Sequence, residues 1–364
     1  MTRATRATIN LDALRHNLLV AKQAAPKSRH LAVIKANAYG HGIVPVAKVL
    51  IEADALAVAC VDEAVQLRDA GVTKAIVILE GFINLQELEV CHRYQLCPVI
   101  HQIEQIALLE TECGDSLAVW FKVDTGMHRL GFSTEQASQA WRRLLECRGV
   151  DHKNSVLMSH LANADDLTDT KTDQQYEIFS QLHHQLKTHT GTPVASLANS
   201  GGLLGWPQTR MDWVRPGILL YGISPFKNKT GADDALRAVM TMKSRLIAIN
   251  QHKCGDTVGY GGSWTCPEDM AVGVVAIGYG DGYPRHAKSG TPVLINGQRA
   301  TLVGRVSMDM ITVDLRGIQK SELGDEVILW GEGLAAEEIA NYSDTIAYDL
   351  LCGVNPRVSV SYES

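Results

Sequence analysis

The chain has 364 residues, of which 46% are apolar and 20% are charged, and its net charge is −6. This composition is typical of a globular protein and excludes a fibrous or wholly disordered chain. A slightly acidic balance lacks the basic footprint of proteins that bind nucleic acid or anionic membranes, so we expect small molecules or protein as partners, no nucleic acid and no membrane. The length predicts about two domains.

The expected location is the cytoplasm. No apolar run follows the two arginines near the N-terminus, so we expect no secretory signal. No stretch of about 18 apolar residues is present to span a bilayer. Eight cysteines are scattered without a C-x-x-C pair, which indicates reduced thiols rather than a disulfide framework.

Short apolar runs alternate with amphipathic segments up to about residue 230. Helical spacing of apolar residues marks Leu11 to Ala21, 61–70 and 174–189. The apolar runs are of strand length and nearly continuous, as in strands that are buried on both faces; they are 31–34, 55–60, 75–79, 97–100, 117–123, 155–158, 194–197 and 214–221.

Eight strands, each followed by a crossover, predict a parallel (β/α)₈ TIM barrel over residues 1–234. An open doubly wound sheet is the alternative, but its G-x-G-x-x-G fingerprint is missing after the first strand. We therefore favour the barrel, whose reactive groups lie at the carboxyl ends of its strands.

Residues 235–364 have the texture of a mainly β domain. Asn296-Gly297 between two apolar runs predicts a two-residue hairpin turn. Within this half only the segment 335–342 has a helical pattern. The remaining strand-like runs are 242–249, 270–277, 311–315, 326–330 and 358–360.

Charged and small residues follow several of the predicted barrel strands. Lys35 closes the first apolar run, and two interpretations stay open: a snorkelling lysine in an ion pair, or an amine that forms a Schiff base with a carbonyl. Lys122 ends the fifth run, and Arg129 follows it, so burial of both would require an anion nearby.

The later strands deliver groups of another kind. His160 follows the sixth run, and Arg215 lies in the eighth. Ser200, with glycines after it, and Gly217 stand where barrels commonly bind a phosphate. The segment V-G-Y-G-G at 258–262 is, on its own pattern, an ordinary turn with an exposed tyrosine.

Together these motifs resemble the alanine racemases. The string V-I-K-A-N-A-Y-G-H-G at 33–42 is similar to the pyridoxal phosphate attachment site of that family. Matching motifs in family order cover both halves of the chain, and the likeness is greatest to the biosynthetic bacterial enzymes. The other motifs are F-K-V-D-T-G-M-H-R-L-G-F (121–132), S-H-L-A-N-A-D (159–165), A-N-S-G-G (198–202), W-V-R-P-G-I-L-L-Y-G (213–222), V-G-Y-G-G (258–262), I-G-Y-G-D-G-Y-P-R (277–285) and G-R-V-S-M-D-M (304–310).

The resemblance implies a pyridoxal 5'-phosphate-dependent isomerase that interconverts L- and D-alanine and provides D-alanine for peptidoglycan synthesis. Lys35 would hold the cofactor as a Schiff base, and no metal is implied. Arg215 would face the pyridine nitrogen with His160 beside it. The phosphate would be held by Tyr39, Ser200, Gly217, Ile218 and Tyr348.

The family also implies a homodimer with shared active sites. Lys35 would exchange the Cα proton on one face of the substrate and Tyr260 of the second subunit on the other. A tyrosine that acts as a base needs nearby positive charge. Arg129 and Met308, the latter again from the second subunit, would bind the substrate carboxylate. Tyr279 would stand at the inner substrate gate, and Lys122 matches a lysine that is carbamylated in many members.

Other functions remain as alternatives. A barrel-type decarboxylase of basic amino acids would need an acidic partner for a long cationic side chain, and a broad-specificity racemase would typically carry an export signal. A non-catalytic pyridoxal phosphate binder of the single-barrel type would lack the second domain. A degenerate, inactive homologue also stays open as an alternative, although no catalytic position is missing.

Overall fold

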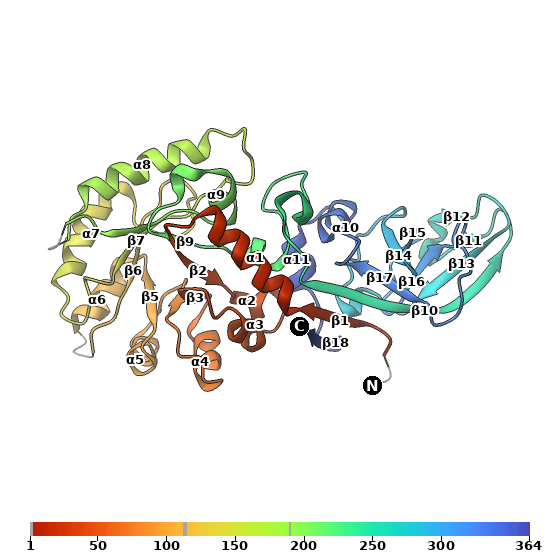
Figure 1. The fold of residues 1–364 in the computed structure, drawn as a ribbon, viewed down its shortest axis with the longest axis horizontal. Coiled ribbons are helices and arrows are strands. Elements are labelled where there is room, and N and C mark those ends of the chain that lie inside the picture. Colours follow the sequence, from red (N-terminus) through yellow and green to blue (C-terminus); the bar gives the residue numbers. More distant parts are fainter. Residues whose placement is uncertain (1–2, 112–114, 189–190) are drawn as a thin grey trace.

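The computed structural model describes residues 3–111, 115–188 and 191–364 and divides into a barrel and a β-rich half (Figure 1). The barrel is closed by eight parallel strands, and β2 pairs with β9 to complete the ring. This confirms the predicted fold class. The strands are β2 (Arg29–Val33), β3 (Ala55–Val58), β4 (Ile76–Ile78), β5 (Cys97–Ile100), β6 (Trp120–Lys122), β7 (Val156–Met158), β8 (Val194–Ser196) and β9 (Trp213–Val214).

Helices cover the outside of the ring (Figure 1). Their apolar stripes are buried, as Leu14 and Leu18 are in α1. The predicted segment 174–189 is helical as far as Gln185, where α8 ends, and its last residue, His189, lies outside the described residues. The helices are α1 (Leu11–Ala24), α3 (Ile43–Val49), α4 (Val61–Asp69), α5 (Leu85–Tyr94), α6 (Ile103–Thr111), α7 (Thr134–Glu146), α8 (Lys171–Gln185) and α9 (Ser200–Gly205), with the short turn α2 (Lys35–Tyr39).

The predicted eighth strand, 214–221, is wrong in its extent. The ladder stops at Val214, and Ile218–Tyr221 forms a 3₁₀ turn instead. Pro216 has no N–H to donate to a ladder, although its carbonyl still accepts from Val33 N at 2.9 Å. The segment therefore leaves the barrel wall at its carboxyl end, where it turns across the mouth.

The second half is built on one eight-stranded sheet, in the order β13-β16-β15-β14-β17-β10-β1-β18. The predicted hairpin is present, with φ of 47° at Asn296 and 78° at Gly297. The strands after the barrel are β10 (Met240–His252), β13 (Met270–Val275), β14 (Pro292–Ile295), β15 (Gln298–Val303), β16 (Ile311–Asp314), β17 (Glu326–Trp330) and β18 (Ser359–Glu363), with a separate pair β11 (Thr257–Val258) and β12 (Trp264–Thr265).

Two elements depart from the sequence analysis. The N-terminal strand β1 (Arg6–Asn10) lies in this second sheet, between β10 and β18, although the barrel begins only at β2. The helix predicted at 335–342 is confirmed as α10 (Ala336–Tyr342), but the expectation that it is the only helical segment of the second half is wrong, because α11 (Ala347–Cys352) follows it. A six-residue helix with three buried positions is too short to show a helical period.

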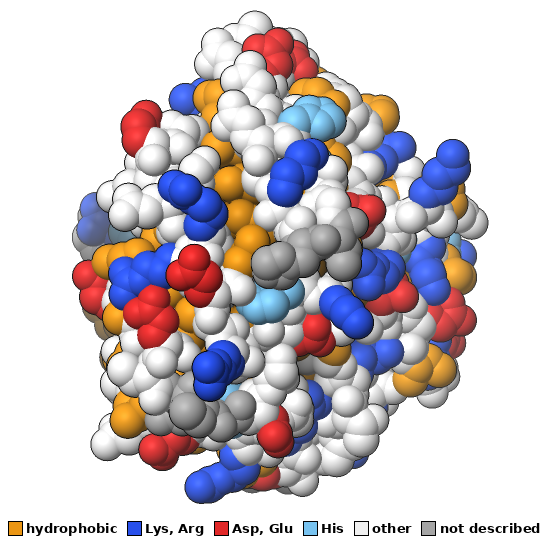
Figure 2. All heavy atoms as spheres, turned by 90° about the vertical axis from the view of Figure 1, so that its left-hand side faces the viewer, with side chains coloured by type: hydrophobic (Ala, Val, Ile, Leu, Met, Phe, Trp, Pro, Cys, Tyr) orange, Lys and Arg blue, Asp and Glu red, His pale blue; other side chains and the backbone are white. Residues whose placement is uncertain are grey.

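Helices α10 and α11 lie between the barrel and the sheet (Figure 1). One continuous cluster of buried apolar side chains joins the barrel to the second sheet. The barrel side of the molecule carries Lys and Arg interspersed with Asp and Glu (Figure 2). Within the described parts of the chain no helix is long and apolar enough to cross a membrane. Seven cysteines are free thiols, and the eighth, Cys113, lies outside the described residues.

Candidate active site

A cavity of about 950 Å³ opens at the carboxyl ends of the barrel strands, beneath α10 and α11. The structure brings to it the predicted residues of the barrel and one from α11. These are Lys35, Tyr39, Lys122, Arg129, His160, Ser200, Arg215, Gly217, Ile218 and Tyr348. They come from segments far apart in sequence because parallel strands present all their carboxyl ends at one mouth.

Lys35 opens a turn of unusual backbone conformation. Ala36, Asn37, Ala38 and Tyr39 all have φ between 51° and 54°, so α2 is a left-handed turn made of non-glycine residues. Each such residue costs roughly 1–2 kcal/mol against the right-handed form. Strain of this kind persists only where the surroundings impose it, and it concentrates at functional sites.

Side chains from within and beside the turn hold it. The Asn37 Oδ1 accepts from Ile43 N at 2.9 Å. The buried His41 ring contacts the carbonyls of Ala38 and Tyr39 through Nδ1, at 3.0 and 2.8 Å. Burial lowers the pKa of His41 to about 4, so at neutral pH its ring is uncharged and Nδ1–H donates to both carbonyls.

Glu63 in α4 reaches the same turn from outside. Its Oε1 accepts from Ala36 N at 2.7 Å, and its Oε2 accepts from Ala59 N at 2.8 Å. The sequence analysis did not single out this residue. The available signal was its place as the third residue of a helix, where a glutamate commonly turns back to accept a backbone N–H.

The predicted phosphate residues form one corner of the cavity. Ser200 Oγ accepts from Gly217 N at 2.9 Å. A Cβ at Gly217 would lie 3.0 Å from the Tyr39 Oη, so a side chain at this position would crowd the hydroxyl where it approaches the backbone. The Tyr39 ring also packs on that of Tyr348, with centroids 5.8 Å apart. Burial raises the pKa of Tyr348 to about 12 and that of Tyr39 further, so both remain neutral hydroxyl donors.

Arg215 forms the floor of the cavity and is 3% exposed. Its guanidinium donates to Ser196 Oγ and to the Ser159 carbonyl, each at 2.6 Å. Burial lowers its pKa to about 10, so it stays protonated. Within the described residues no carboxylate lies at ion-pair distance from it. The His160 Nδ1 lies 3.3 Å away, and burial together with the Arg215 charge holds the pKa of His160 well below its usual range.

Lys122 faces the same space from β6 and is 7% exposed. Burial, followed by the charges of Arg215 and Arg129, lowers its pKa to about 8. A fraction of this amine is therefore neutral near physiological pH. The cavity wall as a whole is cationic and suits an anionic ligand.

Three predicted residues do not reach this cavity in the described chain. Tyr260, in the turn Tyr260–Gly262, is 69% exposed, Tyr279, in the turn Tyr279–Asp281, is 41% exposed, and Met308 is 53% exposed. All three lie in the second half of the chain, and none of them lines the cavity that holds Lys35.

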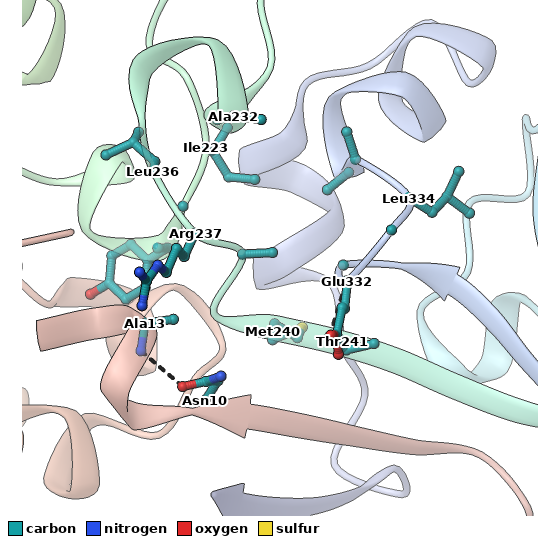
Figure 3. A pocket seen from close by; sticks show the side chains of 18 of the residues that line it. Asn10, Ala13, Ile223, Ala232, Leu236, Arg237, Met240, Thr241, Glu332 and Leu334 are labelled. Atoms are coloured by element: carbon teal, nitrogen blue, oxygen red, sulfur yellow. Dashed lines mark hydrogen bonds between the residues drawn. The ribbon is translucent and has the colours of Figure 1, made fainter. Parts of the chain in front are cut away.

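A second cavity of about 560 Å³ lies where the barrel meets the sheet (Figure 3). Its walls include Asn10, Arg237, Thr241 and Glu332, and the Asn10 side chain is occupied in accepting from Ala13 N. Its walls include neither Lys35 nor Arg215. The larger cavity is therefore the candidate active site.

The larger cavity fits pyridoxal phosphate. Lys35 lies at its edge, and the buried Arg215 guanidinium lines its wall. The hydroxyls of Tyr39 and Ser200 lie beside Gly217, at the corner predicted to bind the phosphate. Two family models match the chain. The model "Alanine racemase, N-terminal domain" matches residues 9–225, and "Alanine racemase, C-terminal domain" matches residues 239–362.

The chain belongs to the alanine racemase family.

Relatives of this family span the whole chain. An alanine racemase from Coxiella burnetii is 49% identical over 364 residues and covers 98% of both chains. One from Aeromonas hydrophila is 47% identical over 361 residues, with 99% of both covered. The biosynthetic alanine racemase of Pseudomonas aeruginosa superposes with a TM-score of 0.95 at 41% identity over the full length of both chains.

A more distant solved structure bears on the cofactor. The alanine racemase of Bartonella henselae, solved with covalently bound pyridoxal phosphate, has a TM-score of 0.87 at 29% identity and covers 99% of both chains. The alanine racemase fold, barrel and sheet together, is thus shared over the entire chain.

Proposed function

We propose that this chain interconverts L- and D-alanine, with pyridoxal phosphate held at Lys35. The observation that carries the proposal is the placement of Lys35 on a strained turn at the edge of a cationic cavity, with the Ser200–Gly217 corner and Arg215 across from it. Family membership supplies the substrate. Supply of D-alanine for peptidoglycan and the cytoplasmic location stay predictions.

When bound, pyridoxal phosphate supplies an electron sink that acidifies the Cα hydrogen of an attached amino acid. Tyr39, Ser200, Gly217, Ile218 and Tyr348 would hold its phosphate. The neutral hydroxyls of Tyr39 and Tyr348 can donate to phosphate oxygens without adding a charge.

Arg215 would face the ring nitrogen of the cofactor. Because Arg215 remains protonated, it would donate a hydrogen bond to that nitrogen and would not transfer a proton to it. Its role would be to moderate the electron sink, so that the acid/base residues return the proton to Cα. His160, neutral beside Arg215, completes the hydrogen-bonded wall.

Two acid/base groups would act on opposite faces of the substrate. The Lys35 amine takes or returns the Cα proton on the face on which D-alanine loses it. The Tyr260 hydroxyl of the second subunit serves the L-alanine face. Tyr260 is exposed and does not line the cavity that holds Lys35 in its own subunit. A homodimer in which Tyr260 of one subunit enters the site of the other would bring the two groups to one substrate.

Arg129 would bind the substrate carboxylate, with Met308 of the second subunit closing the site and Tyr279 at its inner gate. Lys122 would act through Arg129. Its partly neutral amine can add to CO₂, releasing one proton and leaving a carbamate anion that pairs with the guanidinium.

Incubation of the purified protein with pyridoxal phosphate and L-alanine in D₂O tests the proposal. We expect D-alanine deuterated at Cα, with no pyruvate and no amine product, and no exchange with Lys35→Ala. Absence of exchange by a wild-type protein that binds the cofactor would refute alanine racemisation and favour another substrate or a non-catalytic binder.

A further inference from the structure

The start of the left-handed turn after Lys35 receives no hydrogen bond from the side chains of Ala36 or Ala38. Neither Ala36 nor Ala38 has a side chain able to bond the backbone, and neither is glycine, which adopts such angles freely. The hydrogen bonds of Asn37 and His41 lie toward the far end of the turn. The start of the turn, next to Lys35, depends on a contact from another helix.

That contact is the carboxylate of Glu63. Oε1 accepts from Ala36 N at 2.7 Å and from Asn37 N at 3.4 Å, and Oε2 accepts from Ala59 N at 2.8 Å. Successive N–H groups point the same way in a turn of this hand, and one anionic oxygen satisfies both. The same carboxylate thereby joins the ends of two neighbouring barrel strands, β2 and β3.

We propose that Glu63 is a positioning residue for the cofactor site. It holds the left-handed turn so that Lys35 and Tyr39 face the cavity from the two ends of one turn. The role deepens the proposed function and rests on it, because Lys35 and Tyr39 matter as a pair only if they hold one cofactor. Glu63 does not itself line the cavity in the described chain.

The chain offers a matched control in Glu87. Glu63 is the third residue of α4, and Glu87 is the third residue of α5. Both are half-buried, and Glu87 Oε2 likewise accepts a backbone N–H from the preceding loop, that of Ile83 at 2.9 Å. Its described hydrogen bonds connect it to that loop and not to the turn.

Glu63→Gln and Glu87→Gln are compared with the wild type in two measurements. A glutamine keeps one acceptor oxygen, but it sets an N–H₂ group against a backbone N–H and loses the charge. In titrations followed by the visible absorbance of the bound cofactor, we expect Glu63→Gln to weaken pyridoxal phosphate binding about tenfold, and Glu87→Gln to leave it within about twofold. Equal affinities in the two variants would overturn the proposal.

The second measurement is amide hydrogen exchange of the protein without cofactor. Its result does not depend on whether the protein is an enzyme. The amides of Gly40, His41 and Gly42 donate to carbonyls within the turn. We expect them to exchange faster in Glu63→Gln than in Glu87→Gln or the wild type. Unchanged exchange would refute the role of Glu63. If exchange is faster in Glu63→Gln but the wild type binds no pyridoxal phosphate, Glu63 holds the turn and the proposed function is refuted.

Discussion

At the scale of single residues, burial sets the chemistry of the cavity more than residue type does. Lys122 is a lysine whose amine is partly neutral, and His160 is a histidine held uncharged, because burial and then the charge of Arg215 lower the pKa of each. The positions of Lys35, Lys122 and Arg215 were predictable, since each lies within or directly after a predicted barrel strand. Glu63 was not, because it acts on a backbone 27 residues away.

Carbamylation of Lys122 is expected to depend on pH. The protonated amine cannot add to CO₂, and the neutral fraction grows as pH rises through about 8, the lowered pKa of this group. At constant dissolved CO₂ we therefore expect carbamate occupancy to increase across that range. A ¹³C carbonyl resonance from labelled CO₂ reports it, with Lys122→Met as the control. A spectrum identical to that of Lys122→Met above pH 8 would contradict the assignment.

At the scale of elements, local patterns predicted what depends on neighbours in the chain. The Asn296-Gly297 turn formed as expected because both residues tolerate positive φ. The strand predicted at 214–221 ends before Pro216. Helix α11 was not predicted, because six residues are too few to show a helical periodicity. Its place over the barrel mouth is set by packing, with Leu350 and Leu351 buried in the core.

Two glycines test how α11 is anchored. Gly282 has φ of 101°, and a Cβ there would clash with the Gly353 carbonyl just after α11. Gly297 has φ of 78°, and no described atom lies within 4 Å of the position of its Cβ. We expect Gly297→Ala to lower the free energy of unfolding by about 1 kcal/mol and Gly282→Ala by more than about 2 kcal/mol in urea titrations. Equal losses would show that the contact with Gly353 is not a constraint.

At the scale of the whole molecule, the two halves are interdependent. The first strand, β1, crosses into the sheet of the second half before the barrel begins, and α10 and α11 lie over the barrel mouth. Tyr260 and Met308 are nevertheless exposed and do not line the cavity. In the homodimer that we propose, each second half would complete the site of the other barrel.

Mixing two inactive variants tests the shared site. In a heterodimer of Lys35→Ala and Tyr260→Phe subunits, one site retains both groups and the other retains neither. With random subunit exchange we expect about one quarter of wild-type racemase activity to return. Mass spectrometry of the mixture establishes that exchange has occurred. If heterodimers form and remain inactive, the two groups do not belong to one shared site.

The chain order of apolar runs, turns and charged strand ends was enough to predict a barrel, a β-rich second half and the main charged residues of the cavity, whereas Tyr39, Ile218 and Tyr348 were expected only from the family resemblance. These features depend on contacts between near neighbours, which the periodicity of side chains records directly. Three features depend instead on segments that come together only when the barrel closes: the place of β1 in the second sheet, the strained turn after Lys35, and the hydrogen bonds of Glu63 to that turn. The contacts that hold these conformations come from residues distant in the sequence, so tertiary packing decides them.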